Sequence, residues 1–262
     1  MNARSALFDV YGDHLRARGG HAPVAALVRL LAPLGVAAPA VRTAVSRMVR
    51  QGWLHAERRS GGPGYSLTPK AVRRLDEAAA RIYRTSDLDW DGRWHLVVTG
   101  HVRDRSARER LRSSFGYLGY APLADSTWVG PRSSDEVDAL LDAEGLRAER
   151  FVAEHDGLSS DLVARAWDLS GLARAYERWL ADAVSTVDAL PEHPTDEQAF
   201  AARSALVHSW RLFLFRDPAL PRTLLPPVWP GDKAADYFAE QSARLLPAAT
   251  RFVDACLEDP RG

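Results

Sequence analysis

The stretch from Pro39 to Leu67 constrains the fold more than any other part of the chain. Four apolar residues in it recur at helical spacing and predict one apolar stripe: Val41, Val45, Met48 and Val49. Gly52 is expected to end this helix, because glycine readily adopts positive φ. Two short apolar runs, Trp53-Leu54 and Tyr65-Ser66-Leu67, flank a basic, glycine-rich segment that suits a hairpin turn. The order helix, strand, basic loop, strand is that of a winged helix.

The opposite side of this predicted helix is polar and basic. It carries Arg42, Thr43, Ser46, Arg47 and Arg50. Such a helix suits a DNA major groove, where arginine reaches guanine edges and hydroxyl groups reach phosphates or bases. Arg58 and Arg59 in the loop are expected to contact phosphate or the minor groove. A surface helix with a solvated basic face and an ordinary hairpin has the same pattern, so this stretch alone leaves DNA binding open.

Two further helices are predicted before this stretch. One spans Ser5 to Arg18, and the second spans Val24 to Leu34, followed by a tight turn at Gly35. This turn joins the Val24–Leu34 helix to the helix that begins at Pro39. The two form a helix-turn-helix, in which the helix from Pro39 is expected to contact bases. Thr68-Pro69 predicts the start of a linker helix that runs to about Arg84, since proline is tolerated in the first turn.

The charge distribution supports a polyanion-binding N-terminal unit. The formal net charge of the 262 residues is zero. Residues 1–84, however, contain 14 Lys and Arg against 5 Asp and Glu, and the remainder contains 20 against 29. The positive excess coincides with the predicted helix and wing, which favours nucleic acid as the partner of this part of the chain.

Composition excludes several classes of protein. No window approaches the roughly 18 uninterrupted apolar residues of a membrane span, so no membrane partner is expected. The polar start, with Asn2, Arg4 and Ser5, argues against a signal peptide. Cys256 is the only cysteine, which excludes an intramolecular disulfide and a multi-cysteine zinc site. We therefore expect a cytoplasmic protein that uses no metal or cofactor.

The length and the pattern of elements predict an α+β, multidomain fold. Residues 1–84 are expected to form a winged helix-turn-helix with a linker helix. In residues 85–167 the predicted order strand, helix, strand, strand, helix, strand is ferredoxin-like. Residues 168–262 are expected to form a helical C-terminal domain, with a capping-box start at Thr195 and a bend at Pro247.

A set of motifs in one order along nearly the whole chain resembles the PaaX family of phenylacetate-degradation repressors. The N-terminal and middle motifs are Val41-Arg-Thr-Ala-Val-Ser-Arg-Met48, Gly52-Trp-Leu54, Tyr65-Ser-Leu-Thr68, Arg81-Ile-Tyr83, Trp90-Asp-Gly-Arg-Trp94, Leu118-Gly119 and Trp128-Val129. The C-terminal motifs are Trp210-Arg211, Asp217-Pro-Ala-Leu-Pro221, Leu224-Leu-Pro226 and Trp229-Pro-Gly231. The resemblance implies a homodimeric repressor that binds a double-stranded DNA operator and is released by phenylacetyl-CoA or another acyl-CoA.

A coenzyme A thioester requires positive charge for its phosphates and an apolar slot for its acyl group. The candidate residues for such an effector are Arg203, His208, Trp210, Arg211 and Trp229. Tryptophan in a helical domain is more often core, and arginine more often pairs with an acid. The middle domain, or its boundary with the C-terminal one, is an equally good place for a pocket.

Two other functions remain open. One is a metal-dependent nuclease on the ferredoxin-like domain, because that fold also occurs in CRISPR-associated nucleases. It would use aspartates such as Asp91 and Asp104. The scattered acids and the absence of an HExxH, GxSxG or phosphate-loop motif argue against an enzyme. The other alternative is a DNA-associated scaffold that responds to no small molecule.

Overall fold

The computed structural model describes residues 1–59, 62–82 and 90–258. The described chain divides into two compact units. Unit 1 is formed by Met1–Thr85, Arg178–Arg211 and Lys233–Gly262, and unit 2 by Ser86–Glu177 and Leu212–Asp232. The tip of the predicted wing, the end of the predicted linker helix and most of the predicted boundary before Trp90 fall outside the described residues.

Unit 1 begins with three helices, a small sheet and a fourth helix. The helices are α1 (Ala3–Val10), α2 (Val24–Leu31), α3 (Ala38–Arg50) and α4 (Pro69–Ile82). The strands are β1 (His21–Ala22), β2 (Leu54–Arg59) and β3 (Gly62–Leu67). The helices predicted before Gly19 and Gly35 are confirmed. The first continues beyond α1 as a π-helical turn, Tyr11–Leu15, and a 3₁₀ turn, Arg16–Arg18. The second continues beyond α2 as a 3₁₀ turn, Ala32–Leu34.

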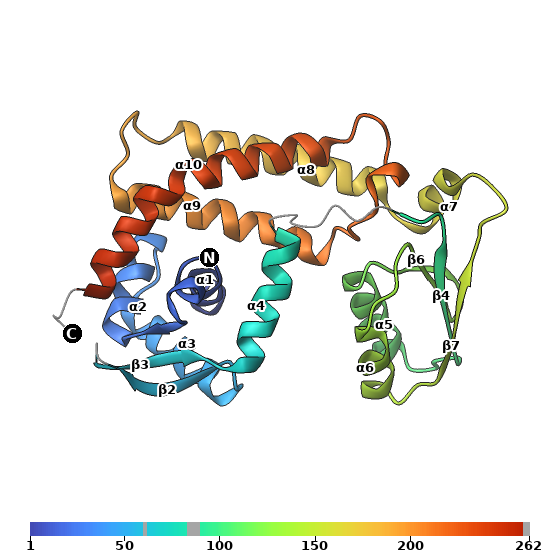
Figure 1. Ribbon diagram of the computed structural model, residues 1–262, viewed down its shortest axis with the longest axis horizontal. Coiled ribbons are helices and arrows are strands. Elements are labelled where there is room, and N and C mark those ends of the chain that lie inside the picture. The colour runs from blue at the N-terminus through green and yellow to red at the C-terminus, as the bar shows by residue number, and fades with distance from the viewer. Residues whose placement is uncertain (60–61, 83–89, 259–262) are drawn as a thin grey trace. The chain divides into compact units, whose positions relative to one another are not determined.

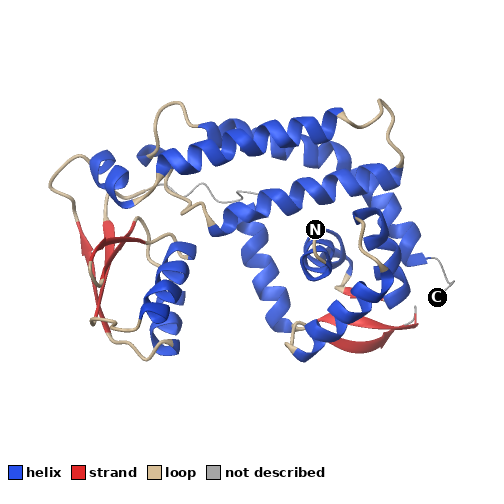
Figure 2. Cartoon of the chain, turned by 180° about the vertical axis from the view of Figure 1, so that it is seen from behind, coloured by secondary structure: helices blue, strands red, loops and turns tan. Residues whose placement is uncertain are grey.

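Helix α1 lies in the middle of unit 1 and contacts α2, α3 and α9 (Asp196–Trp210) (Figures 1 and 2). Its first turn is capped by Asn2, whose side-chain oxygen accepts a hydrogen bond from the Ser5 amide at 2.9 Å. Beyond its end, the Tyr11 hydroxyl donates to the carbonyl of Tyr65 at 2.9 Å. The helix is thereby fixed to the hairpin as well as to its helical neighbours.

The sheet of unit 1 has the order β1-β3-β2, and both pairs are antiparallel. The two strands predicted around the basic loop are confirmed and are longer than expected, whereas the sequence analysis does not predict the two-residue β1. Gly64 of β3 explains why β1 can lie so close to β3. A Cβ atom at Gly64 would lie 2.5 Å from the carbonyl oxygen of Ala22, so only glycine allows this approach.

The C-terminal helices are α8 (Leu169–Asp188), α9 and α10 (Pro230–Glu258). The predicted capping box at the start of α9 is confirmed, because Thr195 and Gln198 each accept a hydrogen bond from the other's backbone. Pro247 lies inside α10, which bends toward its C-terminal end in Figure 1. Apolar residues of α9 and α10 belong to the same core as α1, α2 and α3: Phe200, Ala249, Val253 and Cys256.

The C-terminal residues after the predicted division at 168 are divided between the two compact units. Arg178–Arg211 and Lys233–Gly262 join unit 1, while Leu212–Asp232 joins unit 2. The physical reason in unit 1 is that these helices share the core of the N-terminal helices, with Phe200 fully buried there.

Unit 2 is built on a four-stranded antiparallel sheet of order β5-β6-β4-β7. The strands are β4 (Trp94–Thr99), β5 (Ala121–Ala124), β6 (Thr127–Gly130) and β7 (Ala148–Ala153), and the helices are α5 (Arg105–Tyr117), α6 (Glu136–Ala143) and α7 (Ser159–Ala166). The predicted order strand, helix, strand, strand, helix, strand is confirmed. Helices α5 and α6 cover one face of the sheet (Figure 2).

Apolar cores lie on both faces of this sheet. Under α5 and α6, Val97 packs with Phe115 and Trp128, whose rings stack at 4.5 Å. On the opposite face, Trp94 packs with residues of α7 and with Leu220 and Leu224. This second core explains why the segment Leu212–Asp232 belongs to unit 2.

Candidate nucleic-acid interface

Helix α3 is held by an apolar stripe. Its buried residues are Val41, Ala44, Val45 and Met48, and they pack in the core with α1 and α2. Of the stripe predicted from the sequence, Val49 is partly buried. Gly52 ends the helix at φ +70°, and the Trp53 amide donates back to the Met48 carbonyl at 2.9 Å. The helix is thus fixed along one face, and its other face meets solvent.

The solvent face of α3 carries all five side chains predicted to contact DNA. Arg42, Thr43, Ser46, Arg47 and Arg50 are each exposed. The Thr43 hydroxyl donates to the Pro39 carbonyl of its own helix at 2.9 Å. The three arginine side chains form no ion pair or hydrogen bond with another described residue. Within the described chain their guanidinium groups are therefore not used by the fold.

The two arginines of the predicted wing lie on opposite faces of the β2–β3 hairpin, because strand side chains alternate. Arg58, which is exposed, shares a face with Leu54, the residue that anchors the hairpin in the core. Arg59 is tied down: its Nε lies 3.0 Å from the Glu57 carboxylate, and its Nη1 donates to the Gly19 carbonyl at 3.2 Å. The structure does not bring these two arginines together, so they are not equivalent candidates.

Glu57 is the acid that organises this hairpin. Its carboxylate accepts a hydrogen bond from the Ser66 hydroxyl and pairs with Arg59. The Ser66 and Arg59 hydrogen bonds hold the pKa of Glu57 below its ordinary value, so the carboxylate stays charged at neutral pH. Because this carboxylate offsets the charge of Arg59, Arg58 is the better candidate for a phosphate contact.

A cation that the sequence prediction missed lies in the first turn of α4. The Lys70 ammonium is 4.9 Å from the centre of the Trp53 ring, and the same ring meets Phe8 edge-on at 5.2 Å. Lys70 is exposed, as is Arg73 one turn along α4. The positive charge of residues 1–84 is the sequence signal that includes them, but the pattern of α4 by itself predicts only a linker helix.

Comparison with known proteins gives matches to family models along the chain. Residues 2–71 match the PaaX-like protein model, 87–163 the PaaX protein central Cas2-like domain, and 167–255 the PaaX-like protein C-terminal domain. The transcriptional repressor PaaX of Escherichia coli is 30% identical over 264 residues, covering 97% of this chain and 83% of that protein. The chain belongs to the PaaX family.

A solved structure is also similar to this PaaX-family chain. It is an uncharacterized protein from Mycobacterium tuberculosis, 27% identical, with a TM-score of 0.66 and coverage of 97% of this chain and 98% of that one. The family resemblance stated from the sequence is confirmed. The model for the central domain also fits the mixed α/β unit that the structure shows for residues 90–163.

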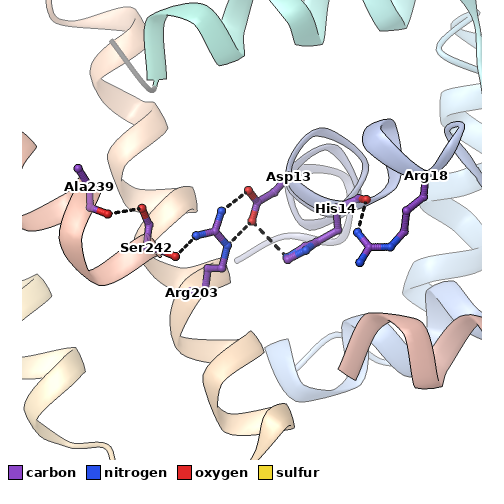
Figure 3. Close-up of polar contacts among 6 residues, drawn as sticks. All are labelled: Asp13, His14, Arg18, Arg203, Ala239 and Ser242. Atoms are coloured by element: carbon purple, nitrogen blue, oxygen red, sulfur yellow. Dashed lines mark hydrogen bonds and ion pairs between the residues drawn. The ribbon is translucent and has the colours of Figure 1, made fainter. Parts of the chain in front are cut away.

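Three of the effector candidates take part in a buried polar cluster that joins α9 to α1 and to the turn Tyr11–Leu15 after α1. Arg203 is 4% exposed and donates to both carboxylate oxygens of Asp13, at 2.9 and 2.6 Å, and to the carbonyl of Ser242 (Figure 3). His208 and Arg211 both pair with Asp9, each at 2.7 Å. The structure therefore uses these side chains to join α9 to α1.

His14 completes the cluster. It is 1% exposed, and its Nε2 lies 3.2 Å from Asp13 (Figure 3). Burial lowers the pKa of His14 to about 4, so this ring is neutral at pH 7. Burial raises the pKa of Asp9, which Arg211 and His208 oppose by stabilising the carboxylate. No local sequence pattern indicates these partners, because Asp13 and Arg203 are 190 residues apart along the chain.

The two tryptophan candidates lie in different units. Trp210 is buried in unit 1, stacked on Phe238 at 4.9 Å and edge-on to Trp179 at 4.7 Å. Trp229 is buried in unit 2 and meets Tyr176 edge-on at 6.2 Å. Both rings fill apolar cores here, so the five effector candidates do not line one site within either unit.

The aspartates of the nuclease hypothesis have local structural tasks. Asp104 caps α5 by accepting hydrogen bonds from the Ala107 amide and the Ser106 hydroxyl. The Asp91 carboxylate accepts from the Arg93 amide at 2.9 Å. Among the residues that the structure describes, no group of three His, Cys, Asp or Glu is placed to hold a metal, and no helix is long and apolar enough to cross a membrane.

Proposed function

We propose that this chain is a DNA-binding transcriptional regulator whose N-terminal helices and hairpin form a winged helix-turn-helix. Helix α3 is the recognition helix, and the β2–β3 hairpin is the wing. The single observation that carries the proposal is the exposed face of α3, where three arginines have no partner in the described chain. Its membership of a family that includes a transcriptional repressor supports the same conclusion.

The chemistry of the recognition face suits a duplex. Arg42, Ser46 and Arg50 follow one another at four-residue intervals and so lie along one row of α3. Thr43 and Arg47 form the next row. Arginine offers bidentate hydrogen bonds to guanine, and the hydroxyl groups supply phosphate or base contacts. Arg58 at the wing and Lys70 on α4 add positive charge for the phosphate backbone.

The proposal extends to repression and its release. We expect a cytoplasmic homodimer that represses an operon for aromatic, phenylacetate-type catabolism, with phenylacetyl-CoA or another acyl-CoA thioester as its effector and no resident cofactor. A two-fold dimer would place its recognition helices about 34 Å apart or a multiple of it, one turn of DNA. Effector binding in the rest of the chain would change that spacing.

The experiment is a mobility-shift titration on the DNA upstream of the chain's own gene. An Arg42→Ala/Arg47→Ala protein should bind at least tenfold more weakly, and its salt slope should fall by about 0.9 for each phosphate that it no longer neutralises. An Arg244→Ala/Arg251→Ala protein is the matched control, because it removes the same charge from exposed positions on α10. Equal affinity and slope in the α3 variant and the wild type would refute the assignment of α3.

Thermal stabilisation by a ligand distinguishes the regulator from the scaffold alternative. A regulator that binds phenylacetyl-CoA must show a higher melting temperature with it, because a ligand of the native state stabilises that state. A protein that binds the operator but shows no such shift with any acyl-CoA would support the scaffold. Magnesium-dependent DNA cleavage that is abolished in Asp104→Asn would support the nuclease instead.

A further inference from the structure

Unit 2 contains a pocket of about 620 Å³ whose lining includes none of the residues predicted to bind an effector. It lies where the end of β4, the first turns of α5 and the β5–β6 hairpin meet, and all its lining residues belong to unit 2. Its volume falls within the roughly 300–1,000 Å³ typical of small-molecule sites. The pocket is therefore large enough for an organic ligand.

The charged lining favours an anion. His101, Arg108 and Arg112 line the pocket, against a single acid, Asp125. Arg108 is held in place, because its Nη1 donates to the carbonyls of Val102 and Arg103 at 3.2 and 3.3 Å. The Arg112 side chain forms no ion pair or hydrogen bond with another described residue, so its donors remain available to a ligand.

The remaining wall favours an apolar group beside that anion. Leu123 lines the pocket and is 41% exposed, so its side chain is accessible to an apolar group of a ligand. Trp128 forms the inner wall, with its ring stacked on Phe115. Among the described residues the buried Trp128 indole N–H has no hydrogen-bond partner, although buried N–H groups almost always have one.

The hairpin that bounds the pocket is fixed before any ligand arrives. The Ser126 carbonyl accepts from the Thr99 amide at 2.8 Å and from the Thr99 hydroxyl at 3.3 Å. Ser126 itself adopts φ +61°, a conformation that side chains other than glycine seldom hold without such support. Pre-formed walls lower the entropy cost of binding.

We propose that this pocket binds an organic anion that carries an apolar group, and that this is where the regulator receives its signal. The second clause rests on the function proposed above. Arg112 and His101 contact the anionic part, Arg108 contributes charge at the mouth, and Leu123 and Trp128 contact the apolar part. An acyl-CoA thioester and a free aryl carboxylate share this chemistry.

The test uses the full chain and four probes: phenylacetyl-CoA, coenzyme A, phenylacetate and the fluorescent apolar anion anilinonaphthalene sulfonate. Binding is measured by calorimetry, or by fluorescence for the last probe. Arg112→Ala and Leu123→Asp should each weaken the best-binding probe about tenfold, a change typical of removing one charge-assisted hydrogen bond or one covered leucine. Both side chains are exposed, so neither variant disturbs the core.

Arg147→Ala is the matched control, since it removes an exposed arginine of unit 2 that does not line the pocket. It should bind every probe within twofold of the wild type, and Arg112→Lys should recover part of the affinity. Equal affinity in Arg112→Ala, Leu123→Asp and the wild type overturns the pocket assignment. Failure of all four probes to bind overturns it as well.

The outcomes separate this inference from the proposed function. If phenylacetyl-CoA releases operator DNA equally from the wild type and both pocket variants, the regulator stands and the pocket fails. If anilinonaphthalene sulfonate depends on Arg112 and Leu123 but phenylacetyl-CoA neither binds nor releases DNA, the pocket stands and the effector assignment fails. Coenzyme A and phenylacetate show which part of the thioester the pocket contacts.

Discussion

Replacing Arg203 by methionine should destabilise the protein strongly, because this arginine is buried in the ionic cluster of unit 1. Its guanidinium donates twice to Asp13 and once to the Ser242 carbonyl. The Asp13 side chain is 6% exposed, so the mutation leaves a carboxylate without its main partner and with little access to water. Breaking a buried pair in this way costs about 3–5 kcal/mol. The total free energy of unfolding of a folded domain is only about 5–15 kcal/mol.

Substitutions of Asp13 and of the exposed Arg251 test whether burial of the ion pair causes this loss of stability. Asp13→Asn should cost a similar amount, since it leaves the buried Arg203 without the carboxylate that neutralises its charge. Arg203→Met/Asp13→Asn removes both charges, and its cost should be several kcal/mol below the sum of the two single substitutions. Arg251, which pairs with Asp196 at 2.6 Å but is 62% exposed, is the control. Arg251→Met should cost less than about 1 kcal/mol, because solvent screens that pair.

The assay is urea unfolding of the full chain, followed by circular dichroism and by tryptophan fluorescence. If Arg203→Met lowers the free energy of unfolding by less than about 1 kcal/mol, the Arg203–Asp13 pair does not hold α9 in place. Arg203 would then be available to a ligand, as the sequence analysis predicts. A large decrease in stability with unchanged phenylacetyl-CoA affinity in the remaining folded protein would instead confine Arg203 to a structural role.

Three smaller predictions concern stability. Gly64→Ala should cost about 1–3 kcal/mol by urea unfolding, because the new Cβ meets the Ala22 carbonyl; Gly116→Ala, in open space on α5, should not destabilise. Thr195→Ala should cost about 1 kcal/mol in the same assay, since it removes the α9 capping box. His14, with a pKa of about 4 against 6.5 unfolded, contributes stability above pH 6.5. About 3 kcal/mol should disappear as pH falls from about 6.5 toward 4, and a His14→Gln protein should show a shallower decline in a pH series of melting temperatures.

The sequence was sufficient for elements with a strong local signal. The stripe through Val41, Val45 and Met48 predicts both α3 and its solvent face, because a helix repeats every 3.6 residues. The glycines at 19, 35 and 52 mark helix ends, and each has positive φ. The Thr195 capping box is also a local pattern, in which the capping residues are three positions apart.

What the sequence could not supply are contacts between distant residues. Arg203 is a ligand candidate in the sequence because its neighbours there are aromatic and basic, and nothing local indicates Asp13 as its partner. The close approach of β1 to β3 depends on Gly64, whose role appears only once Ala22 lies beside it. The unit 2 pocket likewise joins residues from 99 to 128, so no single motif could indicate it.

The buried cluster also limits how an effector can act. Helix α1 contacts both α3 and α9. Asp9 of α1 pairs with His208 and Arg211, and Asp13, in the turn Tyr11–Leu15 that follows α1, pairs with Arg203. Separating α1 from α9 would break these ion pairs and expose core side chains such as Phe200, whose burial alone contributes about 1.5–3 kcal/mol. Coupling free energies between sites are typically about 1–3 kcal/mol. An effector of ordinary strength is therefore too weak to rearrange unit 1 internally. Under the function proposed above, we therefore expect the unit that carries α3 to move as one body, so that an effector would act on the spacing of two such bodies along the DNA.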